Sequence, residues 1–339
     1  IKMKKKKRVL IIRCGLLGDT VDATSVIEPL MELYNGNVEI NWVSRPGICD
    51  LFKFDKRIKK TYILRRTKLP FYLNIDKLKI ILESFFNPYE LILNLEIGNK
   101  FNDIVSWSKS NKKIGMPNNF INDDIFKEHR VEHQLRILNI FNDNYNKNKA
   151  IPSIIGAVEN KIKNKFPLSK KFVVLCPTNS HFKKENYRGY RAWPIDSWNK
   201  LIKQIISKTN LNIILVGDKK EHKYFNCFYP LHERTFDLSG KTTIPELITI
   251  MKLSEFVIAT DSGSVHIAGA SASNIISIHG PTNYYQSAPY KTNKNNIKIA
   301  TLNLPCSPCY DTQAIKKCSK NICMHNLSPE KIFDLMKGF

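Results

Sequence analysis

The sequence predicts an α/β protein made of two doubly wound, Rossmann-like domains that face a cleft. The first observation is the alternation of short apolar runs with helical patterns along the 339 residues. The second is a pair of glycine-bearing loops, residues 13–19 and 260–266, each of which follows an apolar run. The third is length, because about 100–200 residues per domain gives about two domains.

The apolar runs are expected to be strands covered on both faces, because they are short and continuous rather than alternating. The first series lies at Val9–Ile12, Val38–Val43, Thr61–Leu64, Leu91–Leu95 and Lys113–Gly115. The second series lies at Phe172–Cys176, Asn212–Val216, Phe256–Ala259, Ile275–His279 and Ile297–Ala300. Two series of this kind, separated by helices, indicate two parallel sheets.

Helical patterns fill the intervals between these runs. Asp196–Lys208 carries its large apolar residues on one face at helical spacing, and Thr243 and Glu246 have the spacing of a capping box. Pro29 lies inside the helix expected after residue 19, so that helix should be short or restart at Pro29. The Asn- and Lys-rich stretch Asn142–Ser169 is the expected domain boundary.

Each glycine-bearing loop leads from a strand into a helix. Such a turn points backbone N–H groups outward at the positive end of the helix dipole, where anions bind. A carboxylate there, Asp19 in the first loop and Asp261 in the second, stands at the carboxyl edge of its sheet. We therefore expect one site in each half of the chain, with the two facing each other.

The formal net charge of +23 favours anionic partners, namely nucleic acid, an acidic membrane surface or phosphorylated substrates. No apolar run is long enough to span a membrane. The basic run at residues 4–8 lacks the apolar core and cleavage site of a signal peptide. It is interpreted either as a solvated tail or as a contact with anionic lipid headgroups.

Several motifs, taken in order, resemble glycosyltransferase family 9, the ADP-heptose:lipopolysaccharide heptosyltransferases. The first is the stretch from Arg13 to Asp19, with Gly15 and Gly18. The later ones are residues 191–194 (Arg-Ala-Trp-Pro), 217–221, 238–242, 261–266, 280–282 and 305–310. The resemblance covers the first 30 or so residues and most of the C-terminal half.

The resemblance implies the GT-B architecture and an inverting transfer without a catalytic metal. It implies an acceptor-side domain over residues 1–160 and a nucleotide-sugar domain over residues 161–325. It also implies that the last segment, residues 326–339, packs back on the first domain. The expected location is the cytoplasm, peripheral to the inner membrane of a Gram-negative bacterium.

The resemblance also implies the roles of individual residues. Asp19 matches the general base, and Gly15 and Gly18 shape its acceptor-side loop; the structural alternative for Asp19 is a helix N-cap. The residues that match the donor site are Asp261, Ser262, Gly263, His266, Glu221, Arg191, Thr178, Lys241 and Thr242. The alternatives are a packed side chain for His266 and a solvated one for Glu221.

Arg191 stands where family members often carry lysine, and a guanidinium binds a diphosphate with a planar fork rather than a point charge. The stretch before it resembles an insertion and adds Lys183, Lys184 and Arg188. Any of these four cations could meet the diphosphate, and the ordinary interpretation of at least two of them is a solvated charge.

Four of the eight cysteines cluster as Cys306, Cys309, Cys318 and Cys323. This spacing suits a closed, structural metal site, most often zinc, and neighbouring lysines would favour thiolates. Relatives that glycosylate autotransporter proteins have a four-cysteine iron site in this region, so iron is the other candidate. Disulfides or free thiols are the alternative interpretation.

Three functions remain open. The first is heptose transfer from ADP-heptose to the phosphorylated inner core of lipopolysaccharide at an anionic membrane leaflet. The second keeps this chemistry and transfers the sugar to a protein or another glycan. The third is a nucleic-acid-binding protein with a zinc module; it leaves Asp19 and Asp261 unexplained, so no nucleic-acid partner is expected. The sequence leaves the oligomeric state unknown.

Overall fold

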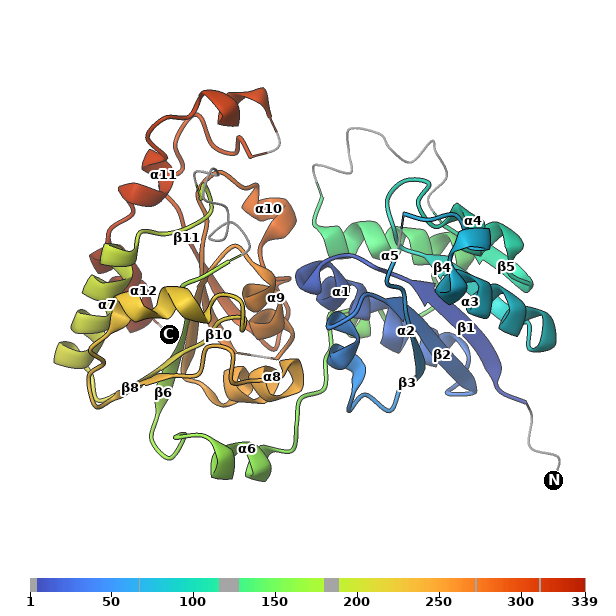
Figure 1. The fold of residues 1–339 in the computed structure, drawn as a ribbon, viewed down its shortest axis with the longest axis horizontal. Helices are drawn as coiled ribbons and strands as arrows, with labels where there is room; N and C mark the ends of the chain where they lie inside the picture. Colours follow the sequence, from blue (N-terminus) through green and yellow to red (C-terminus); the bar gives the residue numbers. More distant parts are fainter. Residues whose placement is uncertain are drawn as a thin grey trace. The chain divides into compact units, whose positions relative to one another are not determined.

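The chain divides into two compact units, Ile1–Ile155 and Gly156–Phe339, a boundary inside the predicted stretch and slightly ahead of residue 160. The structure is a computed structural model that describes residues 5–66, 68–115, 128–179, 189–271, 273–310 and 312–338. In Figure 1 each unit is a sheet with helices packed against it. Across these ranges, every helix is too short or too polar to cross a membrane.

The first unit is built on a parallel sheet with the strand order β3-β2-β1-β4-β5. Its strands are β1 (Lys7–Ile12), β2 (Val38–Ser44), β3 (Ile58–Ile63), β4 (Tyr89–Asn94) and β5 (Ser110–Ile114). The predicted strands of this unit are confirmed, although β1, β3, β4 and β5 begin earlier than expected. The chain moves outward from β1 to β3 and then crosses to β4 on the other side of β1.

The helix after Asp19 is interrupted, as Pro29 predicts. α1 (Leu17–Ala23) passes through a 3₁₀ turn, η1 (Thr24–Val26), into α2 (Ile27–Leu33), whose first turn holds Pro29 where no N–H is needed. The other helices are α3 (Ile75–Phe86), α4 (Asn102–Trp107) and α5 (Arg130–Phe141), with the 3₁₀ turns η2 (Ile48–Phe52), η3 (Phe71–Leu73) and η6 (Lys147–Lys149). α3 and α4 bury Ile80 and Ile104 in one cluster with residues of β1 and β4.

The second unit has a parallel sheet in the order β11-β10-β9-β6-β7-β8. Its strands are β6 (Phe172–Cys176), β7 (Asn212–Leu215), β8 (Thr235–Asp237), β9 (Phe256–Thr260), β10 (Asn274–Ile278) and β11 (Asn296–Ala300). The predicted strands are confirmed here too. β8 is an addition that the sequence analysis missed, because this edge strand is short and has no apolar run.

The helices of the second unit complete the doubly wound fold. They are α6 (Glu159–Lys165), α7 (Ile195–Lys208), α8 (Ile244–Leu253), α9 (Gly263–Ala270), α10 (Tyr284–Ser287), α11 (Ile322–His325) and α12 (Pro329–Lys337), with η7 (His222–Phe228) and η8 (Gln313–Lys317). The capping box of α8 is confirmed, since Glu246 accepts from the backbone N–H of Thr243 at 2.8 Å. The α7 helix is confirmed as well, one residue longer at its start.

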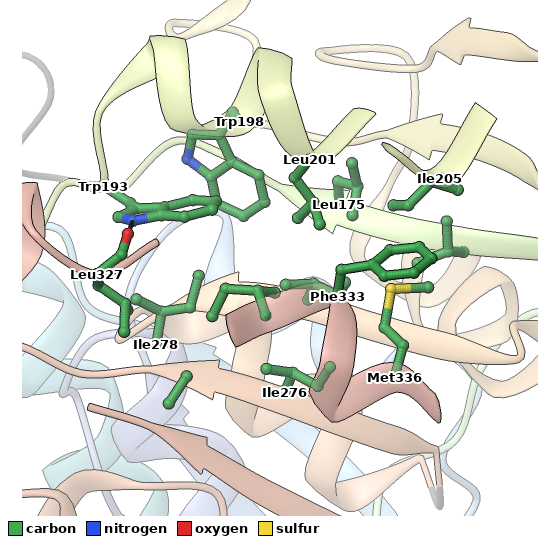
Figure 2. Close-up of a cluster of buried hydrophobic side chains, with 14 of the residues drawn as sticks. Leu175, Trp193, Trp198, Leu201, Ile205, Ile276, Ile278, Leu327, Phe333 and Met336 are labelled. Atoms are coloured by element: carbon green, nitrogen blue, oxygen red, sulfur yellow. Dashed lines mark hydrogen bonds between the residues drawn. The ribbon is translucent and has the colours of Figure 1, made fainter. Parts of the chain in front are cut away.

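The C-terminal segment differs from its expected position. α12 packs against α7 and β10 of the second unit, where Phe333 and Met336 enter the core (Figure 2). The indole of Trp193 donates to the carbonyl of Leu327 at 2.9 Å and fixes the chain just before α12. The expectation that residues 326–339 pack on the first domain is therefore wrong: their apolar face completes the core of the second.

Candidate functional site

Polar side chains gather at the point of each sheet where the strand order reverses. In the first unit this point lies between β1 and β4, and the Arg13 guanidinium donates across it to the carbonyl of Leu95 at 2.9 Å. In the second it lies between β6 and β9, and the Asn179 amide donates across it to the hydroxyl of Thr260 at 2.9 Å. Open parallel sheets bind ligands outside the carboxyl ends of their strands at such switch points.

Asp19 lies in the first turn of α1, directly above the switch point of the first unit. Its Oδ1 lies 3.0 Å from a guanidinium nitrogen of Arg130 and 3.3 Å from one of Arg13. Its Oδ2 accepts from the backbone N–H of Leu16 at 3.0 Å. Asp19 is therefore not the N-cap of the alternative interpretation: it is a half-buried carboxylate held between two cations.

The two glycines of this loop serve its packing. A Cβ on Gly15 would lie 2.7 Å from the Cβ of Asp19 and 2.9 Å from its Oδ2, closer than real contacts allow. Gly15 is thus required for the position of Asp19. Gly18 is buried within α1, immediately before Asp19.

Two residues of this cluster were missed by the sequence analysis. Glu96 follows β4, accepts from the backbone N–H of Cys14, and lies 3.9 Å from Arg13. Arg130 begins α5, 111 residues after Asp19. The place of Glu96 after a predicted strand was a usable signal, whereas the sequence around Arg130 gave none.

Asp261 lies at the end of β9 in the second unit and is buried. A guanidinium nitrogen of Arg191 stands 3.5 Å from its Oδ2, so the structure brings these two predicted residues together. The Arg191 guanidinium also lies over the ring of Tyr310, 5.1 Å from its centroid. A buried carboxylate beside a partly exposed cation, in the loops above a switch point, suits a ligand that carries both hydroxyl and phosphate groups.

The electrostatics around Asp261 involve two histidines. Burial alone would raise the pKa of Asp261, but the charges of His279, Arg191 and His266 and a hydrogen bond from Thr282 bring it below its usual range. Burial lowers the pKa of His279, whose ring nitrogens bond to hydroxyls of Ser277 at 2.8 Å and Thr282 at 3.1 Å. The His279 imidazole is therefore neutral near neutral pH, and Arg191 is the permanent cation beside Asp261.

His266 is buried on α9, the helix that begins at Gly263. Ser262 occupies the N-cap position of this helix, but its side chain does not cap it. The Ser262 hydroxyl is buried and has no hydrogen-bond partner among the residues that the structure describes. A buried hydroxyl without a partner costs free energy, which a bound ligand would recover.

Thr178 and Glu221 meet above the ends of β6 and β7. The Thr178 hydroxyl donates to Glu221 at 2.6 Å, and the same carboxylate oxygen accepts from the backbone N–H of Asp218 at 3.2 Å. A Cβ on Gly217 would lie 3.0 Å from this hydroxyl and 2.7 Å from the Phe225 ring. Glu221 is buried, so the solvated alternative is wrong.

Lys241 and Thr242 follow β8, farther along the same sheet edge. The Lys241 ammonium donates to the carbonyl of Asp237 at 2.7 Å. Gly240 has a φ of +68°, and a Cβ there would lie 3.0 Å from the backbone of Lys219. Of the other predicted phosphate cations, Lys183, Lys184 and Arg188 lie outside the described residues, and Arg191 is the one that the structure places at Asp261.

The four clustered cysteines are free thiols in the structure. Burial, with repulsion from Cys306 and Cys318, raises the pKa of Cys309. Burial, with repulsion from the other three, raises the pKa of Cys323 to about 11. For Cys309 and Cys323, the expected lowering of the thiol pKa by neighbouring lysines is therefore wrong. The thiols are neighbours, but no three His, Cys, Asp or Glu side chains in the described ranges are gathered closely enough to hold a metal ion.

The chain is similar to heptosyltransferases in sequence. It is 30% identical over 135 residues to a lipooligosaccharide heptosyltransferase 2 of Campylobacter jejuni, a match that covers 39% of this chain. The same match spans only 42% of that relative's length. A lipopolysaccharide heptosyltransferase 1 of Campylobacter coli is 26% identical over 316 residues, 86% of this chain and 88% of the relative.

The fold is shared with a solved structure, the ADP-heptose lipopolysaccharide heptosyltransferase II of E. coli. The two superpose with a TM-score of 0.74 at 15% identity, over 98% of each chain. This likeness confirms the predicted GT-B fold. The model of glycosyltransferase family 9 (heptosyltransferase) matches residues 102–320, and the chain belongs to that family.

Proposed function

We propose that the protein is an inverting glycosyltransferase that moves heptose from ADP-heptose to a phosphorylated inner-core acceptor of lipopolysaccharide. The observation that carries this proposal is the pair of carboxylate–cation clusters at the two switch points, Asp19 with Arg130 and Asp261 with Arg191. Family membership and the similarity to a lipopolysaccharide heptosyltransferase 1 support the choice of sugar and acceptor.

The second unit would bind the donor. The partly exposed Arg191 guanidinium is suited to a diphosphate, because it presents several N–H donors in a fixed plane. The Ser262 hydroxyl and the N-terminus of α9 at Gly263 add donors on the same sheet edge. Glu221 would accept from a ribose hydroxyl, with Thr178 holding its carboxylate, and Asp261 would contact the sugar.

Cations at this edge would also assist the reaction itself. Breaking the bond between the anomeric carbon and the diphosphate leaves negative charge on the departing ADP. Arg191 stabilises that charge where it develops, which lowers the barrier. Lys241, at the end of β8, is a further cation for the nucleotide.

The first unit would bind the acceptor and supply the base. Inverting transfer is a single displacement, in which the acceptor hydroxyl attacks as its proton leaves. Asp19 would take that proton, a contribution of about 10²–10⁴ in rate for a well-placed base. Arg13 and Arg130 lie beside its carboxylate and would orient it toward the acceptor. This role requires Asp19 and Asp261 to act on the same sugar.

Location follows from the acceptor. We place the protein in the cytoplasm of a Gram-negative bacterium, peripheral to the inner membrane, where a lipid-linked acceptor is exposed. The net charge of +23 supports attraction to an anionic leaflet and a phosphorylated acceptor.

The four-cysteine segment is proposed to bind one structural metal ion, zinc or iron. Its support is the Cys306, Cys309, Cys318, Cys323 spacing and the mutual proximity of four free thiols. As placed, these thiols do not form a ligand set, so binding requires the segment to rearrange. No step of the transfer passes through this metal, and no catalytic metal is proposed.

Calorimetry with ADP-heptose, ADP and UDP-sugars, followed by a transfer assay, tests the function. The proposal expects tight binding of ADP-heptose and ADP, weak binding of UDP-sugars, and transfer to a heptose-free lipopolysaccharide core. Preference for a UDP-sugar, or transfer to a protein acceptor alone, would contradict it.

A further inference from the structure

Helix α3 exposes large apolar side chains on its outer side in addition to those that it buries on its inner side. Its inner face buries Ile80 and Ile81 against the sheet. Its outer face exposes Ile75 (68%), Leu82 (56%) and Phe86 (85%). Large exposed apolar patches mark surfaces that bind a partner or a membrane.

The apolar surface extends beyond α3 onto its neighbours. The preceding turn η3 exposes Tyr72 (65%) and Leu73 (63%). Trp107, at the end of α4, is 57% exposed, and its ring centroid lies 5.2 Å from that of Phe71 in η3. We call the set Tyr72, Leu73, Ile75, Leu82, Phe85 and Phe86 the outer α3 face. Its helical part, from Ile75 to Phe86, is about 16 Å long.

Lysines surround this face, and the carboxylates of α3 are paired with cations. Asp76 pairs with Arg65 at 3.2 Å, and Glu83 pairs with Arg8 at 2.8 Å and with Lys60. Lys5 and Arg8 lie at the C-terminal end of α3, where the Lys5 ammonium is 3.4 Å from the side-chain oxygen of Asn87 and Arg8 donates to the Asn87 carbonyl. Exposed lysines therefore flank an apolar surface whose acidic groups are already paired.

The position of Lys79 distinguishes a lipid surface from a protein partner. Lys79 is exposed and projects from the outer side of α3, between Ile75 and Leu82 in helical order. The core of a protein interface is depleted of lysine. At a bilayer, by contrast, a lysine lays its stem along apolar surface and places its ammonium among the headgroups.

We propose that the outer α3 face, with Trp107 and the flanking lysines, is the surface on which this protein docks to an anionic phospholipid membrane. α3 has 12 residues, too few to span a bilayer, so it lies in the plane of the interface. The inference deepens the proposed function and rests on it for the membrane location. Vesicle binding nevertheless needs neither donor nor acceptor, so the two claims fail separately.

The chain carries its own fluorescent reporter for this surface. Of its four tryptophans, Trp42, Trp193 and Trp198 are fully buried, and Trp107 is exposed beside the outer α3 face. Vesicles of phosphatidylglycerol and brominated phosphatidylcholine should quench the exposed tryptophan. Trp107→Phe should abolish the quenching without loss of binding. Quenching that persists in Trp107→Phe would overturn the proposal.

Sedimentation with the same vesicles provides the second measurement. The double variant Leu82→Ser/Phe86→Ser should bind at least tenfold more weakly than the wild type. Val158→Ser, an exposed apolar residue of the second unit, is the matched control and should bind normally. Because both altered side chains are exposed, the thermal melting temperature should be unchanged, which excludes misfolding as the cause.

The proposal fails if the wild type ignores anionic vesicles, or if the double variant binds them as the wild type does. It also fails if the double variant changes a dimer of this protein into a monomer without weakening vesicle binding, because the face would then be a contact with a second copy of the chain. Transfer to a water-soluble acceptor fragment should be equal in wild type and double variant. If the wild type binds vesicles but transfers no sugar, the proposed function is wrong and the docking surface stands.

Discussion

The side-chain amide of Asn179 donates a hydrogen bond to the hydroxyl of Thr260, 2.9 Å away, and so joins the ends of β6 and β9. The same amide donates to the backbone carbonyl of Arg191 at 3.1 Å. Asn179 thus fixes both Thr260, which immediately precedes Asp261, and the backbone of Arg191, the cationic partner of Asp261. The geometry of the donor half-site depends on this link.

Asn179→Ala is expected to lower the free energy of unfolding by about 1–3 kcal/mol, because it leaves buried polar groups without a donor. It should also weaken ADP binding, since Arg191 and Asp261 lose their common support. Urea denaturation and calorimetry measure the two effects. Asn160→Ala, an exposed site on α6, should change neither. Wild-type values in Asn179→Ala would show that the link is dispensable.

Gly15→Ala is expected to reduce turnover because the new methyl group occupies the space of Asp19. ADP binding, in the other unit, should be unchanged. A double-mutant cycle with Asp19→Asn tests whether Gly15 acts through Asp19. If it does, the double variant turns over no more slowly than Asp19→Asn alone. Additive losses would mean that Gly15 has a separate role.

The stability of the second unit should fall as pH decreases below about 6.5, the ordinary pKa of histidine. Burial lowers the pKa of His279, so below that pH the unfolded chain binds a proton that the folded protein resists. Asp261, whose pKa is also lowered, adds a further loss only at more acid pH, as its folded pKa is approached.

Urea unfolding, monitored by tryptophan fluorescence at several pH values between 7 and 5, measures how the unfolding midpoint depends on pH. His279→Gln should have a flatter profile, even if it is less stable throughout. His232→Gln, at an exposed position, should keep the wild-type slope. An unchanged slope in His279→Gln would remove this residue as the cause.

Purified protein is expected to contain about one zinc or iron ion per chain by elemental analysis, as a four-cysteine site holds one ion. Cys306→Ser and Cys309→Ser should each lose it. Cys227→Ser, a thiol outside the segment, should keep it. A clean preparation without metal would end this proposal.

The central strands of both sheets could be predicted from sequence because they are continuous apolar runs that depend little on distant contacts; the edge strands β3 and β5 are partly polar and less buried. β8 could not, since Thr235–Asp237 is a short edge strand held by its pairing with β7. The positions of Asp19 and Asp261 at their sheet edges could be predicted too, because each follows a strand within a few residues. The cluster of Asp19 with Arg130 was unpredictable, because it joins residues that meet only in the folded unit.

The C-terminal segment shows a different limit. The spacing of Ile332, Phe333 and Met336 is that of an amphipathic helix, but an apolar stripe does not say which core it joins. The family resemblance suggested the first domain. The structure instead uses these side chains to cover β10 and α7 in the second (Figure 2).

The most direct test of the central claim is steady-state transfer by Asp19→Asn, paired with its affinity for ADP-heptose. Loss of the base should reduce kcat by at least about a hundredfold while the donor dissociation constant stays near its wild-type value. Asp143→Asn, an exposed carboxylate of the same unit, should behave as wild type. Turnover by Asp19→Asn close to that of the wild type would contradict the account.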